Sequence, residues 1–237
     1  MLDFAAARRM MVDSQLRTSD VTEPRLIAAM LALPRERFLP PEGAALAYLD
    51  IDVPVTGAQA HKPVRSLLKP MVLARLIQAA EVAEGDHVLD VGCATGYSSA
   101  ALARLARAVV ALEDDASLAA QARDNLHALG IRHVEVVSGP LTEGWPSRGP
   151  YDVIILNGAS QIVPKALLRQ LKPSGRLVGV LRQGAAGKAM LYRPIGGEYS
   201  GRPVFDAAAR CCLDLPSRSR SFSSEQSVFY AFFALQP

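Results

Sequence analysis

The stretch His87-Val88-Leu89-Asp90-Val91-Gly92-Cys93-Ala94-Thr95-Gly96-Tyr97 decides the fold of this chain. It begins as an apolar run typical of a β-strand, turns through small residues between Gly92 and Gly96, and continues into an Ala- and Leu-rich segment typical of a helix. A strand that leads through a glycine turn into a helix presents backbone N–H groups and the positive end of a helix dipole. Cofactors bind at such turns, but the Gly-x-x-x-Gly spacing is weak unless its surroundings agree.

Strands and helices alternate through the residues that follow this stretch, as in an α/β fold with a doubly wound, mostly parallel sheet. Later segments have strand character with few helical signals, which predicts an antiparallel strand or hairpin at the end of the sheet. The predicted strands are 87–91, 108–112, 133–137, 151–156, 176–181, 188–195, 210–215 and 228–235. The predicted helices are 97–106, a segment capped by Asp114 or Asp115 that ends at Gly130, and a segment opened by Pro164 that includes Leu171.

The chain divides on its pattern into an N-terminal part, 1–80, and an α/β core with a β-rich tail, 81–237. The N-terminal part is predicted to be a helical cap, with helices at 3–17, at 70–80, and after Thr22, which can cap a helix whose first turn holds Pro24. Residues 51–68 show no period, and such stretches in compact domains are functional or mobile.

Composition excludes several classes of protein. The net charge of +3 is near balance, whereas proteins that bind nucleic acid or an anionic membrane usually carry a clustered basic face, so we expect neither partner. The three cysteines, Cys93, Cys211 and Cys212, suit neither a disulfide framework nor a metal site. The sequence lacks a signal-type apolar run and a run of transmembrane length, so we expect a cytoplasmic protein. The sequence gives no oligomeric state, although the 228–235 strand can form an edge that pairs with another chain.

Two carboxylates give the glycine turn a specific chemistry. Glu113 follows the second predicted strand, roughly 20 residues beyond the turn, where an acid can accept hydrogen bonds from both hydroxyls of a ribose. Asp90 interrupts a buried strand and needs a partner, either a ligand's amino group or backbone N–H groups of the turn. Ala94 stands where a dinucleotide fingerprint has a second glycine, and Asp90 would repel a pyrophosphate. A cationic cofactor with a ribose and an amino-acid end, S-adenosyl-L-methionine, fits better.

The chain resembles a known family at this point. Residues 88–97 look like the first motif of the class I S-adenosylmethionine-dependent methyltransferases, and further motifs narrow the resemblance to the protein-L-isoaspartate O-methyltransferases. The resemblance runs from about residue 11 to 182 and implies a Rossmann-like methyltransferase fold. Its other motifs are Pro34-Arg35-Glu36-Arg37-Phe38-Leu39-Pro40, Ala47-Tyr48-Leu49-Asp50, Val53-Pro54-Val55, Gly96-Tyr97-Ser98-Ser99-Ala100, Gly144-Trp145-Pro146, Tyr151-Asp152-Val153-Ile154-Ile155, Ala166-Leu167-Leu168-Arg169-Gln170-Leu171-Lys172-Pro173 and Gly175-Arg176-Leu177-Val178.

The chain departs from this family on the acceptor side. Family members carry an Ile-Ser-Gln-Pro segment whose serine lies at the acceptor site. Ala60-His61-Lys62-Pro63 keeps the spacing to the preceding turn and puts His61 at the serine position, whereas Leu67-Leu68-Lys69-Pro70 keeps the spacing to Ala74 and puts Leu68 there. Neither placement has the serine, although Ser66 is close in sequence. His61 and Ser66 are therefore the candidate acceptor-side residues.

Two further departures lie on the cofactor side. The family's Gly-Asp-Gly, whose acid binds near the adenine, is Gly139-Pro140-Leu141 here, and the family's Thr-Ala-Ala is Asn157-Gly158-Ala159. The resemblance and the carboxylates together give a set of candidate cofactor-binding residues, with no metal ligand. They are Asp90, Gly92, Cys93, Ala94, Gly96, Glu113, Pro140, Leu141 and Asn157.

The resemblance implies an enzyme that methylates the free carboxylate of isoaspartyl residues in damaged proteins, with a protein or peptide substrate as its partner. Because the family serine is absent, two alternatives stay open: a methyltransferase of the same fold with a different acceptor, and a non-catalytic protein that binds the cofactor or a partner. In the family the substrate's own carboxylate attacks the methyl group, so positioning supplies much of the rate. The missing serine therefore bears on which acceptor is held rather than on the transfer itself.

Overall fold

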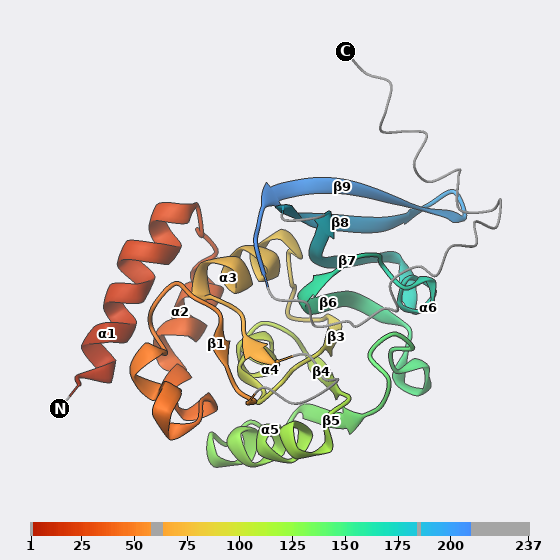
Figure 1. Cartoon of the computed structure of the whole chain (residues 1–237). Coiled ribbons are helices and arrows are strands. Elements are labelled where there is room, and N and C mark those ends of the chain that lie inside the picture. The colour runs from red at the N-terminus through yellow and green to blue at the C-terminus, as the bar shows by residue number, and fades with distance from the viewer. Residues whose placement is uncertain (1, 58–63, 184–185, 210–237) are drawn as a thin grey trace.

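A seven-stranded sheet forms the centre of the molecule (Figure 1). The computed structural model describes residues 2–57, 64–183 and 186–209. The strand order is β5-β4-β3-β6-β7-β8-β9, and β5 to β7 are parallel, whereas β8 and β9 are antiparallel to their neighbours. The predicted α/β sheet with an antiparallel C-terminal end is confirmed. The strands are β3 (His87–Val91), β4 (Ala108–Glu113), β5 (Val134–Ser138), β6 (Tyr151–Ser160), β7 (Leu171–Gln183), β8 (Ala186–Ile195) and β9 (Glu198–Asp206).

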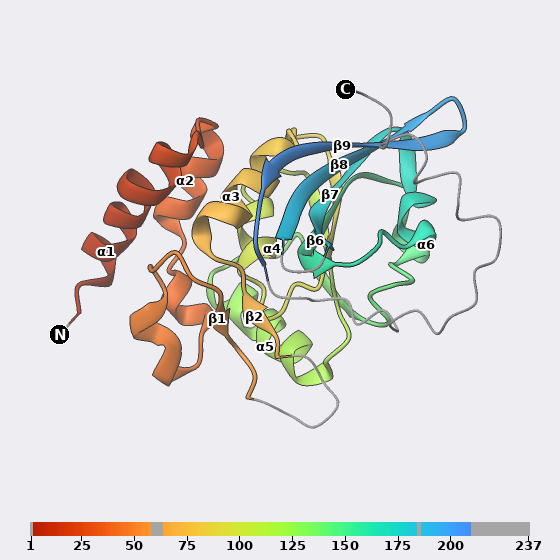
Figure 2. The same ribbon diagram turned by 45° about the horizontal axis from the view of Figure 1, so that its top comes forward.

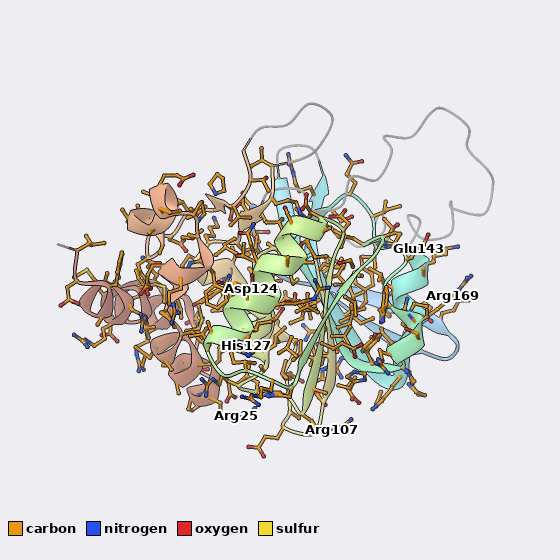
Figure 3. The ribbon with its side chains drawn as sticks, turned by 90° about the horizontal axis from the view of Figure 1, so that it is seen from below. Arg25, Arg107, Asp124, His127, Glu143 and Arg169 are labelled. Carbon is orange, nitrogen blue, oxygen red and sulfur yellow. The ribbon has the colours of Figure 1, made fainter. Side chains whose placement is uncertain are left out.

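Helices cover both faces of this sheet, and alternate strand residues serve the two faces. Val88 of β3 belongs to the hydrophobic core shared with α3 (Pro70–Ala79) and α4 (Tyr97–Leu102), whereas its neighbour Leu89 packs in the core that contains α6 (Lys165–Leu168). Figure 2 shows α3 and α6 on opposite sides of the strands. In the view from below, α5 (Ala116–Ala128) carries Asp124 and His127 across the front, while Glu143 and Arg169 lie toward α6 (Figure 3).

The segment 4–46 packs onto the α3 and α4 side through the same hydrophobic core. It contains α1 (Phe4–Met11), a π-helical turn (Val12–Leu16), α2 (Pro24–Ala32) and short 3₁₀ segments. The predicted N-cap Thr22 is wrong, because Glu23 takes that position and its side chain accepts from the backbone N–H of Arg25. The N–H of Thr22 instead donates to Gln78 of α3 at 2.7 Å. The boundary between parts 1–80 and 81–237 stays a prediction.

Several elements differ from the sequence pattern. The helix predicted over 97–106 ends at Leu102, and the stretch 51–68, with no predicted element, contains two short strands. β9 was not predicted, because its polar, half-exposed residues lack the alternation of a buried strand; the Gly196-Gly197 turn before it, with both φ values positive, was its local signal. Leu171 is the first residue of β7 rather than part of a helix, because α6 ends at Leu168 and Leu171 pairs with Tyr151. The predicted strands 210–215 and 228–235 lie outside the described residues.

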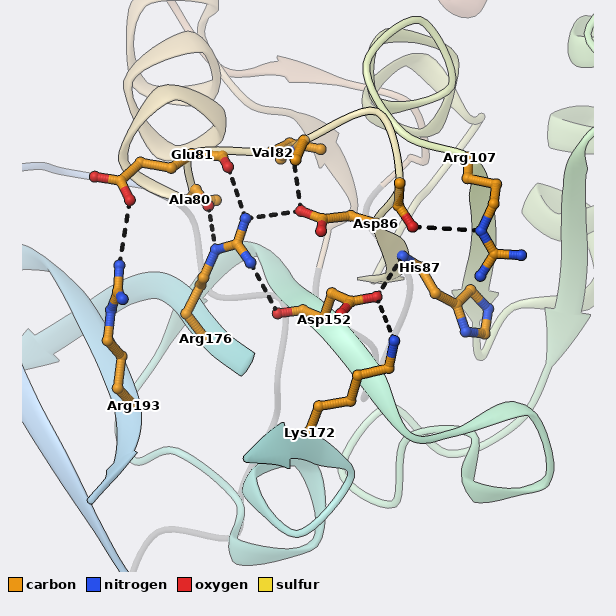
Figure 4. Close-up of polar contacts among 12 residues, drawn as sticks. Ala80, Glu81, Val82, Asp86, His87, Arg107, Asp152, Lys172, Arg176 and Arg193 are labelled. Atoms are coloured by element: carbon orange, nitrogen blue, oxygen red, sulfur yellow. Dashed lines mark hydrogen bonds and ion pairs between the residues drawn. The ribbon is translucent and has the colours of Figure 1, made fainter. Parts of the chain in front are cut away.

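A polar network closes the amino ends of the central strands (Figure 4). The Arg176 guanidinium of β7 donates to Asp86 at 2.7 Å and to the carbonyl of Ala80 at the end of α3. Asp152 of β6 accepts from Lys172 and from the backbone N–H of His87, both at 2.8 Å. These contacts fix α3 to β3, β6 and β7 at one edge, and the glycine turn lies at the opposite, carboxyl edge, where parallel sheets bind ligands. Among the described residues no helix is long and apolar enough to span a membrane.

Close packing between β6 and β7 predicts the effect of one methyl group. A Cβ on Gly179 would lie 2.7 Å from the Cβ of Leu156, whereas a Cβ on Gly85 would meet no atom within 4 Å. We expect Gly179→Ala to lower the free energy of unfolding by about 1–3 kcal/mol through overpacking. The matched control Gly85→Ala should change it by less than about 0.5 kcal/mol. Urea denaturation measures both, and equal stabilities for the two variants would contradict this packing.

Candidate cofactor and acceptor site

The turn after β3 is built from residues in left-handed conformations. Gly92 and Gly96 have φ values of +80° and +95°, where a side chain would be strained. A Cβ on Gly96 would also lie 3.2 Å from the Cβ of Ala122, so this glycine lets α5 approach the turn. Ala94 adopts φ +51° at the position where the dinucleotide fingerprint has a glycine, at a cost on the order of 1 kcal/mol. The turn therefore keeps the shape of a glycine-rich loop with one glycine replaced.

Asp90 is fully buried at the end of β3 beneath this turn. Its Oδ2 accepts hydrogen bonds from the hydroxyls of Ser98 and Ser99, both at 2.6 Å, so the first turn of α4 rather than the backbone of the glycine turn supplies its partners. Asn157 of β6 donates in turn to the Ser98 hydroxyl. Burial raises the pKa of Asp90 to about 6, and the two serine hydroxyls oppose the rise. Its Oδ1 is buried with no hydrogen-bond partner among the described residues.

Glu113, at the end of β4, is the second buried carboxylate. Its Oε2 accepts from the backbone N–H of Ala94 at 2.7 Å, which ties it to the glycine turn. Its Oε1 accepts from the backbone N–H groups of Asp114 and Asp115 at 3.1 and 3.2 Å, and from the Arg65 guanidinium at 2.6 Å. Burial raises the pKa of Glu113, and the charge of Arg65 opposes that rise.

Three groups from different parts of the chain pack against Gly92. The position of a Cβ on Gly92 is 3.5 Å from Nη2 of Arg65, 3.5 Å from the carbonyl oxygen of Asn157 and 3.7 Å from Cδ1 of Leu141. Leu141 is buried, and Pro140 before it is exposed. Three features here fit a ligand with hydroxyl and amino donors. They are the backbone of Gly92, the hydrogen-bonded carboxylate of Glu113, and Oδ1 of Asp90, which has no partner among the described residues.

Cys93 sits in the turn as an inert packing residue. Its side chain is fully buried and clusters with Ala111 and Ala122. Burial, with the nearby charges of Asp90 and Glu113, holds the pKa of its thiol well above the usual value, so the thiol stays neutral. Of the predicted cofactor residues, the structure thus brings Asp90, Gly92, Cys93, Ala94, Gly96, Glu113, Leu141 and Asn157 around one turn, and leaves Pro140 at its exposed margin.

The acceptor segment lies next to this turn as a small antiparallel pair, β1 (Val53–Pro54) with β2 (Ser66–Leu67). Pro70 begins α3 directly after it, which supports the placement that puts Leu68 at the family's serine position. His61 lies outside the described residues. The Oγ of Ser66 is buried and has no hydrogen-bond partner within the described ranges.

One buried and two half-buried side chains hold the backbone of this segment in place. The fully buried Arg35 donates to the carbonyl of Leu68 at 2.7 Å and stacks on the Tyr97 ring, with its guanidinium carbon 4.7 Å from the ring centroid. Asp52 accepts from the N–H of Lys69 at 2.9 Å, and Asp50 accepts from the N–H of Met71 at 3.1 Å. The family-like motif around residues 47–50 therefore anchors the start of α3.

Sequence reasoning missed three side chains of this site: Ser98, Ser99 and Arg65. The two serines follow Asp90 by eight and nine residues, a spacing that returns the first turn of a helix to the end of the strand before it. That signal was present in the sequence. Arg65 had no such signal, because only the fold brings the acceptor segment against β4. Within the described ranges no group of three or more His, Cys, Asp or Glu residues could hold a metal ion.

A family profile and individual relatives point to the same protein family. The family profile described as protein-L-isoaspartate(D-aspartate) O-methyltransferase matches residues 7–200. A Methanoregula boonei protein named protein-L-isoaspartate O-methyltransferase is 40% identical over 171 residues, which cover 72% of this chain and 76% of that protein. A Pelobacter propionicus protein named protein-L-isoaspartate O-methyltransferase 2 is 38% identical over 171 residues, covering 72% and 73%.

Solved structures are similar in fold. One named protein-L-isoaspartate O-methyltransferase gives a TM-score of 0.75 at 24% identity, covering 86% of this chain and 65% of that chain. Another, from Plasmodium falciparum and described as this methyltransferase in complex with S-adenosyl-L-homocysteine, gives a TM-score of 0.71 at 16% identity, covering 87% and 98%. At these identities the likeness concerns the fold alone.

The buried Asp90 predicts a specific dependence of stability on pH. Its pKa is about 6 in the folded chain and near 3.8 when unfolded, so between these values the folded state binds more protons and stability falls as pH rises. Below the unfolded pKa this destabilisation is absent, and above pH 6 it is complete, on the order of 3 kcal/mol. Asp90→Asn cannot ionise and should lack this loss. Urea unfolding at pH 4 and pH 7 measures it for both proteins, and parallel stability curves would contradict it.

Proposed function

The chain belongs to the protein-L-isoaspartate(D-aspartate) O-methyltransferase family, and we propose that it transfers a methyl group from S-adenosylmethionine to the free carboxylate of isoaspartyl residues. The observation that carries the cofactor assignment is the buried Glu113 carboxylate, which the backbone N–H of Ala94 in the glycine turn orients. A carboxylate at this strand end suits the two hydroxyls of a ribose.

In this proposal, each residue around the turn contacts a different part of the cofactor. Glu113 accepts the ribose hydroxyls, Gly92 leaves room for close approach, and Leu141 offers an apolar wall in place of the family's adenine-side acid. Asp90, through its buried and unpartnered Oδ1, accepts from a donor at the amino-acid end. When bound, S-adenosylmethionine supplies a methyl group activated by a sulfonium. Loss of one hydrogen bond to a charged group weakens affinity by about 1.5–3 kcal/mol, which the remaining contacts tolerate.

The chain's part in the transfer is to position the acceptor. A carboxylate is nucleophilic without a protein base, so alignment and exclusion of water supply the rate. The segment that holds the acceptor is fixed by Arg35 and Asp52, which bind its backbone at Leu68 and Lys69. Because these anchors act on the backbone, they do not depend on which side chain stands at the serine position. A chain without the family serine therefore keeps a rigid acceptor segment.

Methyl transfer to a defined peptide tests the proposal directly. We expect label from methyl-labelled S-adenosylmethionine to appear, as a base-labile ester, on a peptide that contains isoaspartate and not on the same peptide with ordinary aspartate. Label that reaches proteins of a cell extract but never the isoaspartyl peptide would favour a different acceptor. If calorimetry detects no binding of S-adenosylhomocysteine at millimolar concentration, both enzymatic interpretations fail.

Glu113 provides the test of the cofactor site. Glu113→Ala should weaken S-adenosylhomocysteine binding by tenfold or more, about 1.4 kcal/mol, because the ribose hydroxyls lose their acceptor. The matched control is Glu135→Ala, which removes an exposed glutamate that pairs with Arg148 at 2.9 Å on β5. Calorimetry measures both affinities. Equal affinity for wild type and Glu113→Ala would show that the ribose lies elsewhere.

A further inference from the structure

We propose that Arg35 is the positioning residue that makes the acceptor site select a carboxylate. Its buried guanidinium lies directly behind the backbone of Leu68, where its positive charge favours an anionic acceptor group over a neutral one. Arg35 acts through its charge and through the Leu68 peptide, and does not touch the acceptor. This inference rests on the proposed function and adds to it the group that takes over acceptor recognition in a chain without the family serine.

Arg35 is a fully buried cation that forms no ion pair within the described residues. Its Nε and Nη2 donate to the carbonyl oxygens of Ala47 and Leu68, both at 2.7 Å. Its Nη1 is buried and has no hydrogen-bond partner in the described part of the chain. The guanidinium also lies over the ring of Tyr97, with its carbon 4.7 Å from the centroid. Carbonyl and ring dipoles stabilise a cation without supplying a counter-charge, so the positive charge of Arg35 stays uncompensated.

Asp52 is the acid that acts on Arg35, and it does not balance this charge. Burial lowers the pKa of Arg35, and the neighbouring groups that oppose this, Asp52 among them, do not make up for the loss of hydration. The Asp52 carboxylate is half-buried and accepts from the backbone N–H of Lys69 at 2.9 Å. Because a guanidinium keeps its proton in proteins, the outcome is a net positive charge behind the acceptor segment.

A second arginine of the N-terminal helices has the same aromatic contact but a balanced charge. Arg8 lies over the ring of Tyr48, with its guanidinium carbon 5.7 Å from the centroid. Its Nη2 pairs with the carboxylate of Glu36 at 3.3 Å. The chain therefore supplies an acid to the arginine of α1 and none, among the described residues, to Arg35.

The acceptor is the anion that the proposed reaction brings to this place. Leu68 stands at the family's serine position, and its apolar side chain offers no donor to a carboxylate. Its carbonyl oxygen points inward to Arg35, so this oxygen does not face and repel an anion. Charge–charge attraction is strong in a low-dielectric interior and extends beyond hydrogen-bond distance. A carboxamide of the same shape as the carboxylate gains nothing from it.

Two other cations of the acceptor segment are described. Arg65 is paired with Glu113, with its Nη2 2.6 Å from Oε1. Lys69 is half-exposed, where water and salt screen its charge. Lys69 is therefore the alternative source of a preference for anions, and a variant of it belongs in the test.

Binding measurements separate the charge of Arg35 from its structural contacts. Arg35→Met removes the charge, and Arg35→Lys keeps the charge and loses the planar fork. The matched control is Arg8→Met, which removes the arginine that has its own acid. Calorimetry at saturating S-adenosylhomocysteine gives the affinities for an isoaspartyl peptide and for the same peptide with its isoaspartyl carboxylate converted to a carboxamide. The ratio of the two affinities is the carboxylate preference.

Wild type should prefer the carboxylate peptide by about tenfold or more, and Arg35→Met should lower this preference to less than about threefold. Arg35→Lys should keep more than about half of the preference, and Arg8→Met should match wild type. A merely structural role of Arg35 would weaken both peptides equally and leave the ratio unchanged, and that result overturns the proposal. Loss of the preference in Lys69→Met with its retention in Arg35→Met also overturns it.

Wild type alone provides a second test if the Arg35 variants unfold, as judged by circular dichroism. Salt screens a buried charge only weakly, so the wild-type preference should fall by less than about threefold between about 0.05 and 0.5 M sodium chloride. A preference that disappears at high salt comes from exposed cations and overturns the inference. Failure of the proposed function is distinct: wild type would then neither bind S-adenosylhomocysteine nor label the isoaspartyl peptide.

Discussion

The burial of the Glu113 carboxylate is the constraint on which the rest of the site depends. A charge without solvent contact persists only when its oxygens are hydrogen-bonded, and here four donors come from three separate segments. Ala94 must turn its N–H inward, which accounts for its left-handed backbone, and the chain after β4 must curl so that Asp114 and Asp115 donate as α5 begins. Arg65 then brings the acceptor segment against β4. The carboxylate of Glu113 thus positions the glycine turn, the start of α5 and the acceptor segment.

Asp90 shows what the same burial does to an acid with weaker partners. Among the described residues its partners are two serine hydroxyls and no cation. Its pKa is raised to about 6, because hydroxyl dipoles compensate less for lost hydration than a guanidinium and three N–H groups do. The unpartnered Oδ1 adds to this cost. Asp90 thus lowers the free energy of unfolding, whereas Val or Leu at this position of the strand would not. A ligand that donates a hydrogen bond to Oδ1 would restore part of that free energy.

The fold was predictable from sequence because its signals are local. The apolar runs of β3 and β6, and the cap of α5 at Asp115, depend on neighbouring residues alone. Much of the turn was predictable for the same reason. β9 and the strand position of Leu171 were not, because an exposed edge strand needs no alternation and Leu171 extends by pairing with Tyr151. The partners of the two buried acids were predictable only in part. The serines that bind Asp90 follow from their spacing along the chain. Arg65 lies 48 residues before Glu113, and only the assembled fold brings the two together.

The contacts that hold the acceptor segment do not involve the side chain at the family's serine position. Arg35 and Asp52 fix the acceptor segment by its backbone, so exchange of a side chain on it leaves the path of the chain unchanged. The side chain of Arg65, directly before β2, reaches Glu113 at the end of β4, with its Nη2 2.6 Å from Oε1. The ion pair of Arg65 with Glu113 therefore joins the acceptor segment to the end of β4.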